Sequence, residues 1–201
     1  MVTEILQRID RIYNAIDVST EADLDKLKPA VTQADKFLSI FIDFRRECND
    51  ADFSNRTHTI VHNIAHLKDH LKKWAAHNGQ EKLKVQQAIE QSLALQIIID
   101  LSNNDKHGYP PRDGGMSKRS PNLVDINRVM QLETQAQKGS MIGITFDANG
   151  VLKSFGDGTA KAVVTGSVVD ANGDNIGDFY NIANDAVKAW EELLADLGIN
   201  S

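Results

Sequence analysis

The stretch Leu93-Ala-Leu-Gln-Ile-Ile-Ile-Asp-Leu101 decides the fold of this chain. If these residues are helical, their apolar side chains point in every direction, and a helix that is apolar all round lies at the centre of a bundle. We therefore expect a central helix over about 80–105. The apolar run contains Gln96 and is far shorter than the roughly 20 residues that a membrane-spanning helix needs. The sequence therefore predicts no membrane partner.

Two segments before this helix have the narrow apolar face of an amphipathic helix, because their apolar residues recur at intervals of three and four. The spacing predicts helices over about 2–17 and 56–78. The apolar positions are Ile5, Ile9, Ile12 and Ile16 in the first, and Ile60, Ile64, Leu67, Leu71 and Trp74 in the second.

A further long helix is expected between these two. Pro29 is suited to its first turn, where a missing backbone N–H costs nothing. The mostly polar stretch 49–55 would end it. Its inner face would consist of Ala34, Phe37, Leu38, Phe41, Ile42 and Cys48.

The amino-acid composition changes after His107. Residues 108–122 are rich in glycine, proline and serine, which predicts a loop. Residues 123–132 fit a helix or a strand, and we favour a helix. Four short strands are expected near 141–147, 150–155, 160–169 and 174–179, because Asn149-Gly150 and Asn172-Gly173 are typical of hairpin turns. A last helix over about 180–197 would cover one face of that sheet.

These elements predict an α+β fold, in which an antiparallel long-helix bundle is followed by a small antiparallel β-meander and a C-terminal helix. The expected division is a helical bundle over 1–107, a loop over 108–122 and the meander with its helix over 123–201. The single cysteine, Cys48, cannot form an internal disulfide, and the N-terminal residues lack the apolar stretch of a signal peptide. A cytoplasmic location is therefore expected.

Charge limits the kind of partner. The formal net charge is −6, and residues 139–201 are strongly acidic because they contain nine acidic residues and only three basic ones. Indiscriminate binding of nucleic acid over the whole surface is disfavoured, since neutralising phosphates requires a basic footprint. The middle of the chain is locally basic. A confined binding site remains open around Lys106, Arg112, Lys118 and Arg119.

Four polar residues form one stripe on the central helix if that helix continues to residue 107. They are Gln96, Asp100, Asn103 and His107. A carboxylate, an amide and an imidazole beside Lys106 could position a phosphate or move a proton, which makes His107, Asp100 and Asn103 the candidate catalytic residues. The alternative is structural: the same groups could bond to neighbouring helices and anchor the following loop.

The helix over 56–78 carries a histidine at every fourth position, His58, His62, His66 and His70. Steps of four rotate steadily around a helix, so only adjacent pairs could share a metal ion, and no HExxH pattern is present. We expect most of these rings on the solvent side, with His66 and His70 flanking a cleft as candidate binding residues. No metal site is predicted.

The remaining motifs suggest no cofactor. Residues 170–178 alternate oxygen-bearing side chains as calcium loops do, but the glycine is out of place for an EF-hand, which favours a hairpin turn. The chain has no phosphate-binding glycine-rich loop of the GxxxxGK[ST] or GxGxxG kind.

Two helical motifs resemble those of known proteins. Residues 66–71, HLKDHL, and 100–107, DLSNNDKH, are similar to the HLKDxL and DLxNxxKH motifs of a group of bacterial and phage proteins, and more remotely to the HEPN superfamily, over about residues 30–112. Membership of that superfamily implies a helical bundle, often dimeric, that in many members cleaves RNA without metal through an Arg-x4-6-His motif. His107 matches the histidine of the motif, whereas positions 100–102 are Asp, Leu and Ser instead of arginine.

The resemblance therefore implies a non-catalytic helical interaction module that binds RNA or a protein partner near residues 106–119. The alternative that it implies is a metal-independent RNA endonuclease, with His107 as general acid and base and Lys106 or Arg112 as the phosphate anchor. A homodimer is compatible with both hypotheses.

Overall fold

The computed structural model describes residues 2–16, 30–34, 37–41, 50–80, 82–108, 113–148 and 152–199. The chain divides into two compact units. The first comprises Met1–Ile16, Ser54–Ile126 and Thr165–Ser201, and the second comprises Asp17–Phe53 and Asn127–Val164.

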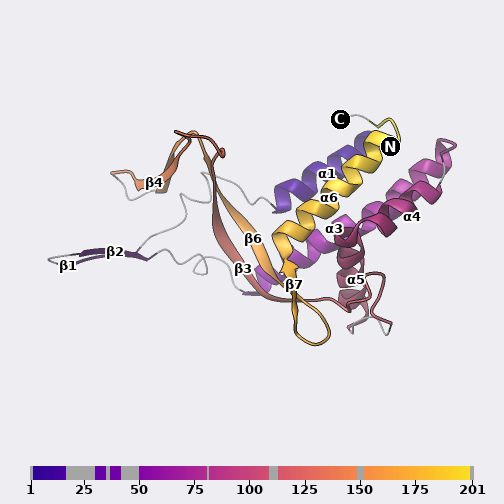
Figure 1. Ribbon diagram of the computed structural model, residues 1–201, viewed down its shortest axis with the longest axis horizontal. Helices are drawn as coiled ribbons and strands as arrows, with labels where there is room; N and C mark the ends of the chain where they lie inside the picture. Colours follow the sequence, from indigo (N-terminus) through magenta and orange to yellow (C-terminus); the bar gives the residue numbers. More distant parts are fainter. Residues whose placement is uncertain are drawn as a thin grey trace. The chain divides into compact units, whose positions relative to one another are not determined.

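The described elements are helices and antiparallel strands, which confirms the α+β class (Figure 1). The helices are α1 (Val2–Ile16), α3 (Asp50–His77), α4 (Lys82–Gln91), α5 (Leu93–His107) and α6 (Phe179–Asp196). The strands are β1 (Ala30–Ala34), β2 (Phe37–Phe41), β3 (Asn122–Glu133), β4 (Ile142–Phe146), β5 (Leu152–Gly156), β6 (Thr159–Val169) and β7 (Asn175–Asp178).

The core of the first unit is formed by the apolar faces that the sequence predicted. Ile60, Ile64, Leu67 and Leu71 of α3 are almost completely buried, as are Ile5, Ile9 and Ile12 of α1. The prediction that α5 is the central helix is also confirmed, because Leu95, Ile97, Ile98, Ile99 and Leu101 are all buried.

The C-terminal helix α6 closes this core. Ala183, Ala186, Val187 and Trp190 on its inner face have no exposed surface. α6 contacts β7 as well as the helices α5, α4 and α1. The expectation that α6 covers one face of the sheet stays a prediction.

Two polar contacts of α6 fix its position against the other helices. The indole of Trp190 donates a hydrogen bond of 3.1 Å to the main-chain oxygen of Ile64 on α3. The hydroxyl of Tyr13 donates to Glu191 over 3.0 Å, which ties α6 to α1, its neighbour in Figure 1. These contacts join segments that are far apart in the sequence.

The long helix expected over 80–105 is two helices, because Ser92 interrupts it. Ser92 has extended backbone angles, and its hydroxyl accepts the N–H of Leu95 as an N-cap of α5. The side chain of Gln96 then donates to the carbonyl oxygens of Ile89 and Glu90, at 3.1 and 2.9 Å. Gln96 thereby caps the end of α4, where the oxygen of Ile89 also accepts the N–H of Ser92.

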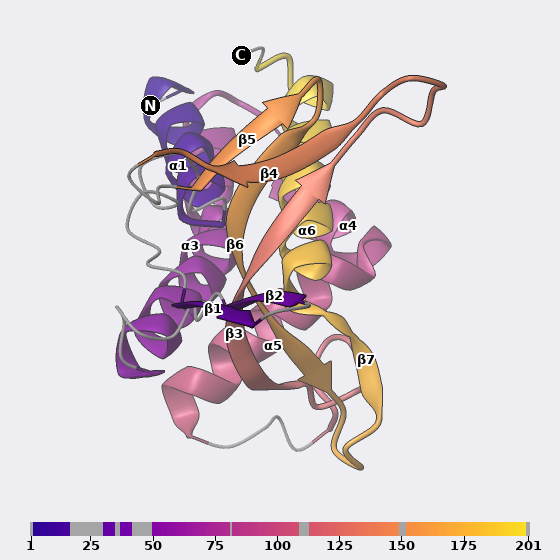
Figure 2. The same cartoon turned by 90° about the vertical axis from the view of Figure 1, so that its left-hand side faces the viewer.

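The strands belong to three pairing groups. β6 lies between β3 and β7, β4 pairs with β5, and β1 pairs with β2. The four strands expected from the Asn-Gly turns are confirmed as β4 to β7, and β4–β5 and β6–β7 are antiparallel pairs (Figure 2). The helix favoured over 123–132 is wrong. Its β-branched and long side chains instead form β3, where a neighbouring strand supplies the backbone partners that decide between the two structures.

The second unit contains the other correction. Residues 30–34 and 37–41, expected in a long helix with Ala34, Phe37, Leu38 and Phe41 on its inner face, form the antiparallel hairpin β1–β2. Valine, threonine, isoleucine and phenylalanine in these segments favour strand pairing. Ile42 and Cys48 lie outside the described residues. The helix α3 begins at Asp50, within the stretch expected to be a loop.

None of the helices in the described part of the chain has the length and apolar character needed to cross a bilayer.

Replacing Trp190 with phenylalanine tests the closing contact of the core. The Trp190→Phe variant keeps an aromatic ring but loses the hydrogen bond to Ile64 and leaves a small void. We expect the free energy of unfolding to fall by about 1–3 kcal/mol, measured by urea denaturation. Lys188→Ala, an exposed change on the same helix, is the control and is expected to stay within about 0.5 kcal/mol of the parent. Equal stability of both variants would contradict this account.

Candidate functional site

The helix α5 ends by presenting a run of polar side chains. Gly108 adopts a left-handed conformation with φ 70°, and its N–H donates to the oxygen of Asn104. This conformation favours glycine, so the helix ends after His107. Asn104, Asp105, Lys106 and His107 therefore occupy the last turn, where cations complement the partial negative charge of the helix end.

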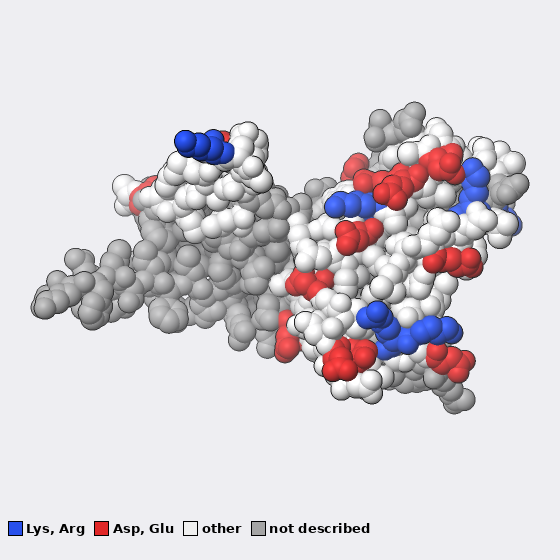
Figure 3. Space-filling model, in the orientation of Figure 1, with Lys and Arg blue, Asp and Glu red and all other residues white. Residues whose placement is uncertain are grey.

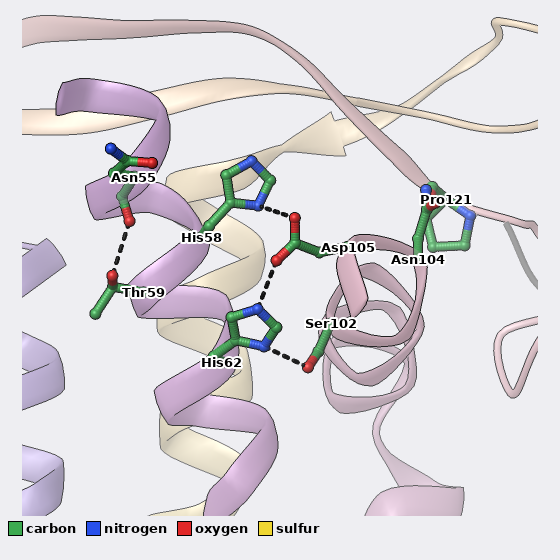
Figure 4. Close-up of polar contacts among 8 residues, drawn as sticks. All are labelled: Asn55, His58, Thr59, His62, Ser102, Asn104, Asp105 and Pro121. Atoms are coloured by element: carbon green, nitrogen blue, oxygen red, sulfur yellow. Dashed lines mark hydrogen bonds and ion pairs between the residues drawn. The ribbon is translucent and has the colours of Figure 1, made fainter. Parts of the chain in front are cut away.

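Asp105 joins this last turn to two histidines of α3. One carboxylate oxygen lies 3.1 Å from Nδ1 of His58, and the other lies 2.6 Å from Nε2 of His62 (Figure 4). The side chain of His58 is 38% exposed and that of His62 is 25% exposed, so both contacts lie at the edge of the core. One carboxylate therefore orients two imidazole rings.

Ser102 of α5 also contacts His62. Its hydroxyl oxygen lies 2.8 Å from Nδ1 of His62. The order Ser102, His62, Asp105 resembles a nucleophilic triad, but Ser102 is only 1% exposed. A substrate cannot reach that hydroxyl, so the hydrogen-bond chain holds α3 against α5 and does not provide a nucleophile.

His66 continues the histidine row on α3 and contacts the next residue of α5. The ammonium of Lys106 lies 2.8 Å from Nε2 of His66, and the ring of His66 is 5.8 Å from that of His62 between centroids. Partial burial and then the charge of Lys106 lower the pKa of His66 below its ordinary value. Nε2 of a neutral imidazole can accept a hydrogen bond from the Lys106 ammonium.

A cavity of about 220 Å³ opens beside this cluster. Its polar lining comes from His58, Asn104, Asp105 and Asn122, and its apolar lining includes Val61, Leu101 and Leu123. The amide of Asn104 donates to the carbonyl oxygen of Pro121 over 3.3 Å, which fixes the start of β3 beside the helix end. The cavity therefore lies among fixed groups of α3, α5 and β3.

The loop after α5 is held from inside by Asp100. This carboxylate is 1% exposed and accepts hydrogen bonds from the N–H of Met116 at 2.9 Å and from the N–H and hydroxyl of Ser117 at 2.8 and 2.7 Å. Gly115 has φ 70°, and a side chain there would overlap the Asp100 carboxylate. Asp100 thus positions the loop.

The same loop presents two exposed basic residues, Lys118 and Arg119. Lys118 and Ser120 have φ angles of 61° and 47°, which residues other than glycine rarely adopt. The N–H of Ser120 donates to Gly114, and the oxygen of Arg119 accepts from Ala171. A strained backbone that neighbouring bonds maintain is typical of functional segments.

The residues that the sequence selected are dispersed around the end of α5. His66 and Lys106 are in contact, and His107 is exposed at the last helical position. Asn103 is half-buried, while Arg112 lies outside the described residues. A part in catalysis for His107, Asn103 and the buried Asp100 stays a prediction.

His70 lies apart from this group. Its pKa is lowered by partial burial and by Arg8, a residue of α1. His70 therefore faces α1 and not the end of α5. The expected polar stripe of α5 is likewise divided, since Gln96 caps α4 and Asp100 holds the loop.

His58 and His62 are the residues that sequence reasoning missed. The apolar stripe of α3 predicts a single buried face, which would leave both rings on the solvent side. Thr57, Val61 and Ala65 are buried as well, so α3 has a second packed face, and α5 lies against it. A spacing of four between two histidines, with an acidic residue near the end of a neighbouring helix, was the available signal.

Among the described residues, no group of three or more histidine, cysteine or acidic side chains is arranged to hold a metal ion.

Charge is mixed on the face that Figure 3 draws. Lysine and arginine side chains there lie among aspartates and glutamates, and no continuous basic surface covers the described part of that face. A ligand with many phosphates in a row would therefore meet repulsion as well as attraction.

The role of Asp100 can be tested by limited proteolysis. In Asp100→Asn, an amide N–H₂ replaces an acceptor oxygen that receives donors from Ser117. We expect faster trypsin cleavage after Lys118 and Arg119 and a loss of about 1–3 kcal/mol in the free energy of unfolding. Asp113→Asn, an exposed change in the same loop, is the control. Unchanged cleavage of Asp100→Asn would exclude the anchoring role.

The contact between Lys106 and His66 predicts a change in titration. In Lys106→Met the nearby positive charge is lost, so the pKa of His66 should rise towards its ordinary value, measured by NMR of the ring protons. Lys73→Met serves as the control, because Lys73 lowers the pKa of His70. That variant should raise the pKa of His70 and leave His66 unaffected. No change in His66 upon loss of Lys106 would show that the two side chains are apart in solution.

Comparison of the chain with protein-family models, with curated proteins and with solved structures gives no match.

Proposed function

We propose that this protein is a helical module that binds a short segment of single-stranded RNA at the end of α5. The observation that carries the proposal is the gathering of His58, His62 and His66 of α3 against Asp105 and Lys106 of α5, at the edge of an open cavity. This arrangement combines ring faces, a cation and a recess in one confined area.

Each part suits an unpaired RNA strand. Bases that are not stacked in a duplex can stack on aromatic or imidazole rings and can enter a recess, as they do in many single-strand binding proteins. Lys106 and the exposed Lys118 and Arg119 are suited to phosphate contacts. The mixed charge on the face that Figure 3 draws disfavours a long duplex, which would need an extended basic surface.

A second function, metal-independent cleavage of RNA, is favoured by one specific contact. Asp105 accepts from Nδ1 of His58, so the proton of a neutral ring lies on Nδ1 and the lone pair lies on Nε2. Among the described residues, no partner occupies that Nε2. An imidazole oriented by a carboxylate, with its second nitrogen open, is suited to act as a general base.

The corresponding cleavage of RNA needs no metal ion. The 2′-hydroxyl of RNA would give its proton to the base and attack the adjacent phosphorus, and the bond from phosphorus to the 5′-oxygen would break. A second acid, for which His107 is the candidate, would protonate the leaving oxygen. The products are a 2′,3′-cyclic phosphate and a 5′-hydroxyl end.

The HEPN-like resemblance of residues 66–71 and 100–107 agrees with both functions and leaves the binding module as the first choice, because the motif's arginine is absent. A cytoplasmic location and a homodimer remain part of this proposal. A lone thiol such as Cys48 is typical of reducing compartments.

Binding and cleavage are separated by one set of measurements. Fluorescence anisotropy with a labelled single-stranded RNA in excess chelator should show binding that weakens with salt. We expect Lys118→Met and Arg119→Met each to lower the slope of log affinity against log salt by roughly 0.7, the value for one phosphate contact on a single strand. Lys188→Met on α6 is the matched control. No binding at low salt would refute the proposal.

The same samples report cleavage when they are analysed on denaturing gels. RNA that stays intact supports the binding module. Chelator-resistant cleavage that disappears in His58→Ala would instead establish the enzyme with His58 as the base, whereas loss only in His107→Ala would assign the reaction to the residue matched by the resemblance.

A further inference from the structure

Two of the polar residues that line the cavity beside α5, Asp105 and Asn104, offer hydrogen-bond acceptors. Asp105 contributes a carboxylate, which only accepts hydrogen bonds when it is ionised. The amide N–H₂ of Asn104 is directed to the oxygen of Pro121, so its Oδ1 is left as an acceptor, with no donor to it among the described residues. Nε2 of His58, which has no partner among the described residues, is a further polar atom of the lining.

The acceptor oxygens of Asp105 and Asn104 limit what the cavity can hold. A phosphate group would bring further negative charge against Asp105. A group that carries two N–H donors satisfies both acceptors, as the amino groups of cytosine and adenine do with carboxylates and asparagines elsewhere. These two residues therefore favour an amino group.

The apolar part of the cavity lining is suited to a flat ring. Val61, Leu101 and Leu123 provide apolar contact for the faces or edges of a heterocycle. The volume of about 220 Å³ is below the usual range of about 300–1,000 Å³ for sites that enclose drug-sized ligands. It is suited to one ring system, with the rest of the ligand outside.

We propose that this cavity holds a single nucleobase with an exocyclic amino group, adenine or cytosine, whose amino group donates to Asn104 and Asp105. In an RNA strand the sugar and phosphates would then lie outside the cavity, near the exposed basic residues. This inference rests on the proposed RNA binding for its source of bases, but the same chemistry would also accept a free nucleotide.

The test compares ligands that differ only in the amino group. Anisotropy competition with hexamers of adenosine and of purine riboside, which lacks the amino group, should show about tenfold tighter binding of the adenosine hexamer. Cytidine hexamers should likewise compete better than uridine hexamers. AMP is measured beside them: binding of AMP that matches the hexamer identifies a free nucleotide as the source of the base, and weaker AMP binding identifies a strand.

Two substitutions locate the preference in this cavity. Asn104→Ala removes one acceptor and should bring the ratio between the adenosine and purine riboside hexamers close to one. Leu123→Trp fills the recess from its half-buried rim and should do the same without disturbing the bond of Asn104 to Pro121. Asn63→Ala, on an exposed position of α3 outside the cavity lining, is the matched control and should retain the ratio.

The outcomes separate this inference from the proposed function. RNA binding without a preference for the amino group, or a preference that survives both cavity substitutions, overturns the nucleobase site and leaves RNA binding standing. A preference for AMP over purine riboside monophosphate without any binding of RNA upholds the site and refutes the proposed function. Absence of binding by every ligand refutes both.

Discussion

The indole of Trp190 on α6 donates a hydrogen bond to the main-chain oxygen of Ile64 on α3. The two residues are 126 positions apart in the sequence. Trp190 has no exposed surface, so its N–H must find a partner inside the protein. Because the acceptor belongs to the middle of α3, the last helix of the chain is fixed against the helix that carries the histidines. The core between them buries the apolar faces of five helices in the first unit.

The position of α3 determines what lies opposite its second face. There, α5 brings Ser102, Asp105 and Lys106 against His62, His58 and His66. Each contact is modest by itself, since an exposed ion pair contributes about 0–1 kcal/mol. These contacts matter more for the positions of the side chains than for stability. Together they orient the rings beside the neighbouring cavity.

Rigid support is concentrated at the end of α5. The buried Asp100 holds the following loop from inside, and Asn104 holds the start of β3. The loop can maintain unfavourable backbone angles at Lys118 and Ser120 because these bonds compensate for the strain. Groups with such support have little conformational entropy to lose if a ligand binds beside them.

The sequence by itself determined the α+β class, the core faces of α1, α3 and α6, the central position of α5 and the Asn-Gly hairpins, because these follow from local periodicity and turn chemistry. It did not determine the structure of residues 30–34, 37–41 and 122–133, whose side chains suit both helix and strand until a partner strand is present. Nor did it single out His58 and His62. Tertiary structure decided that they meet Asp105 of α5, because a residue's position on one helix does not reveal which neighbouring helix will lie against it.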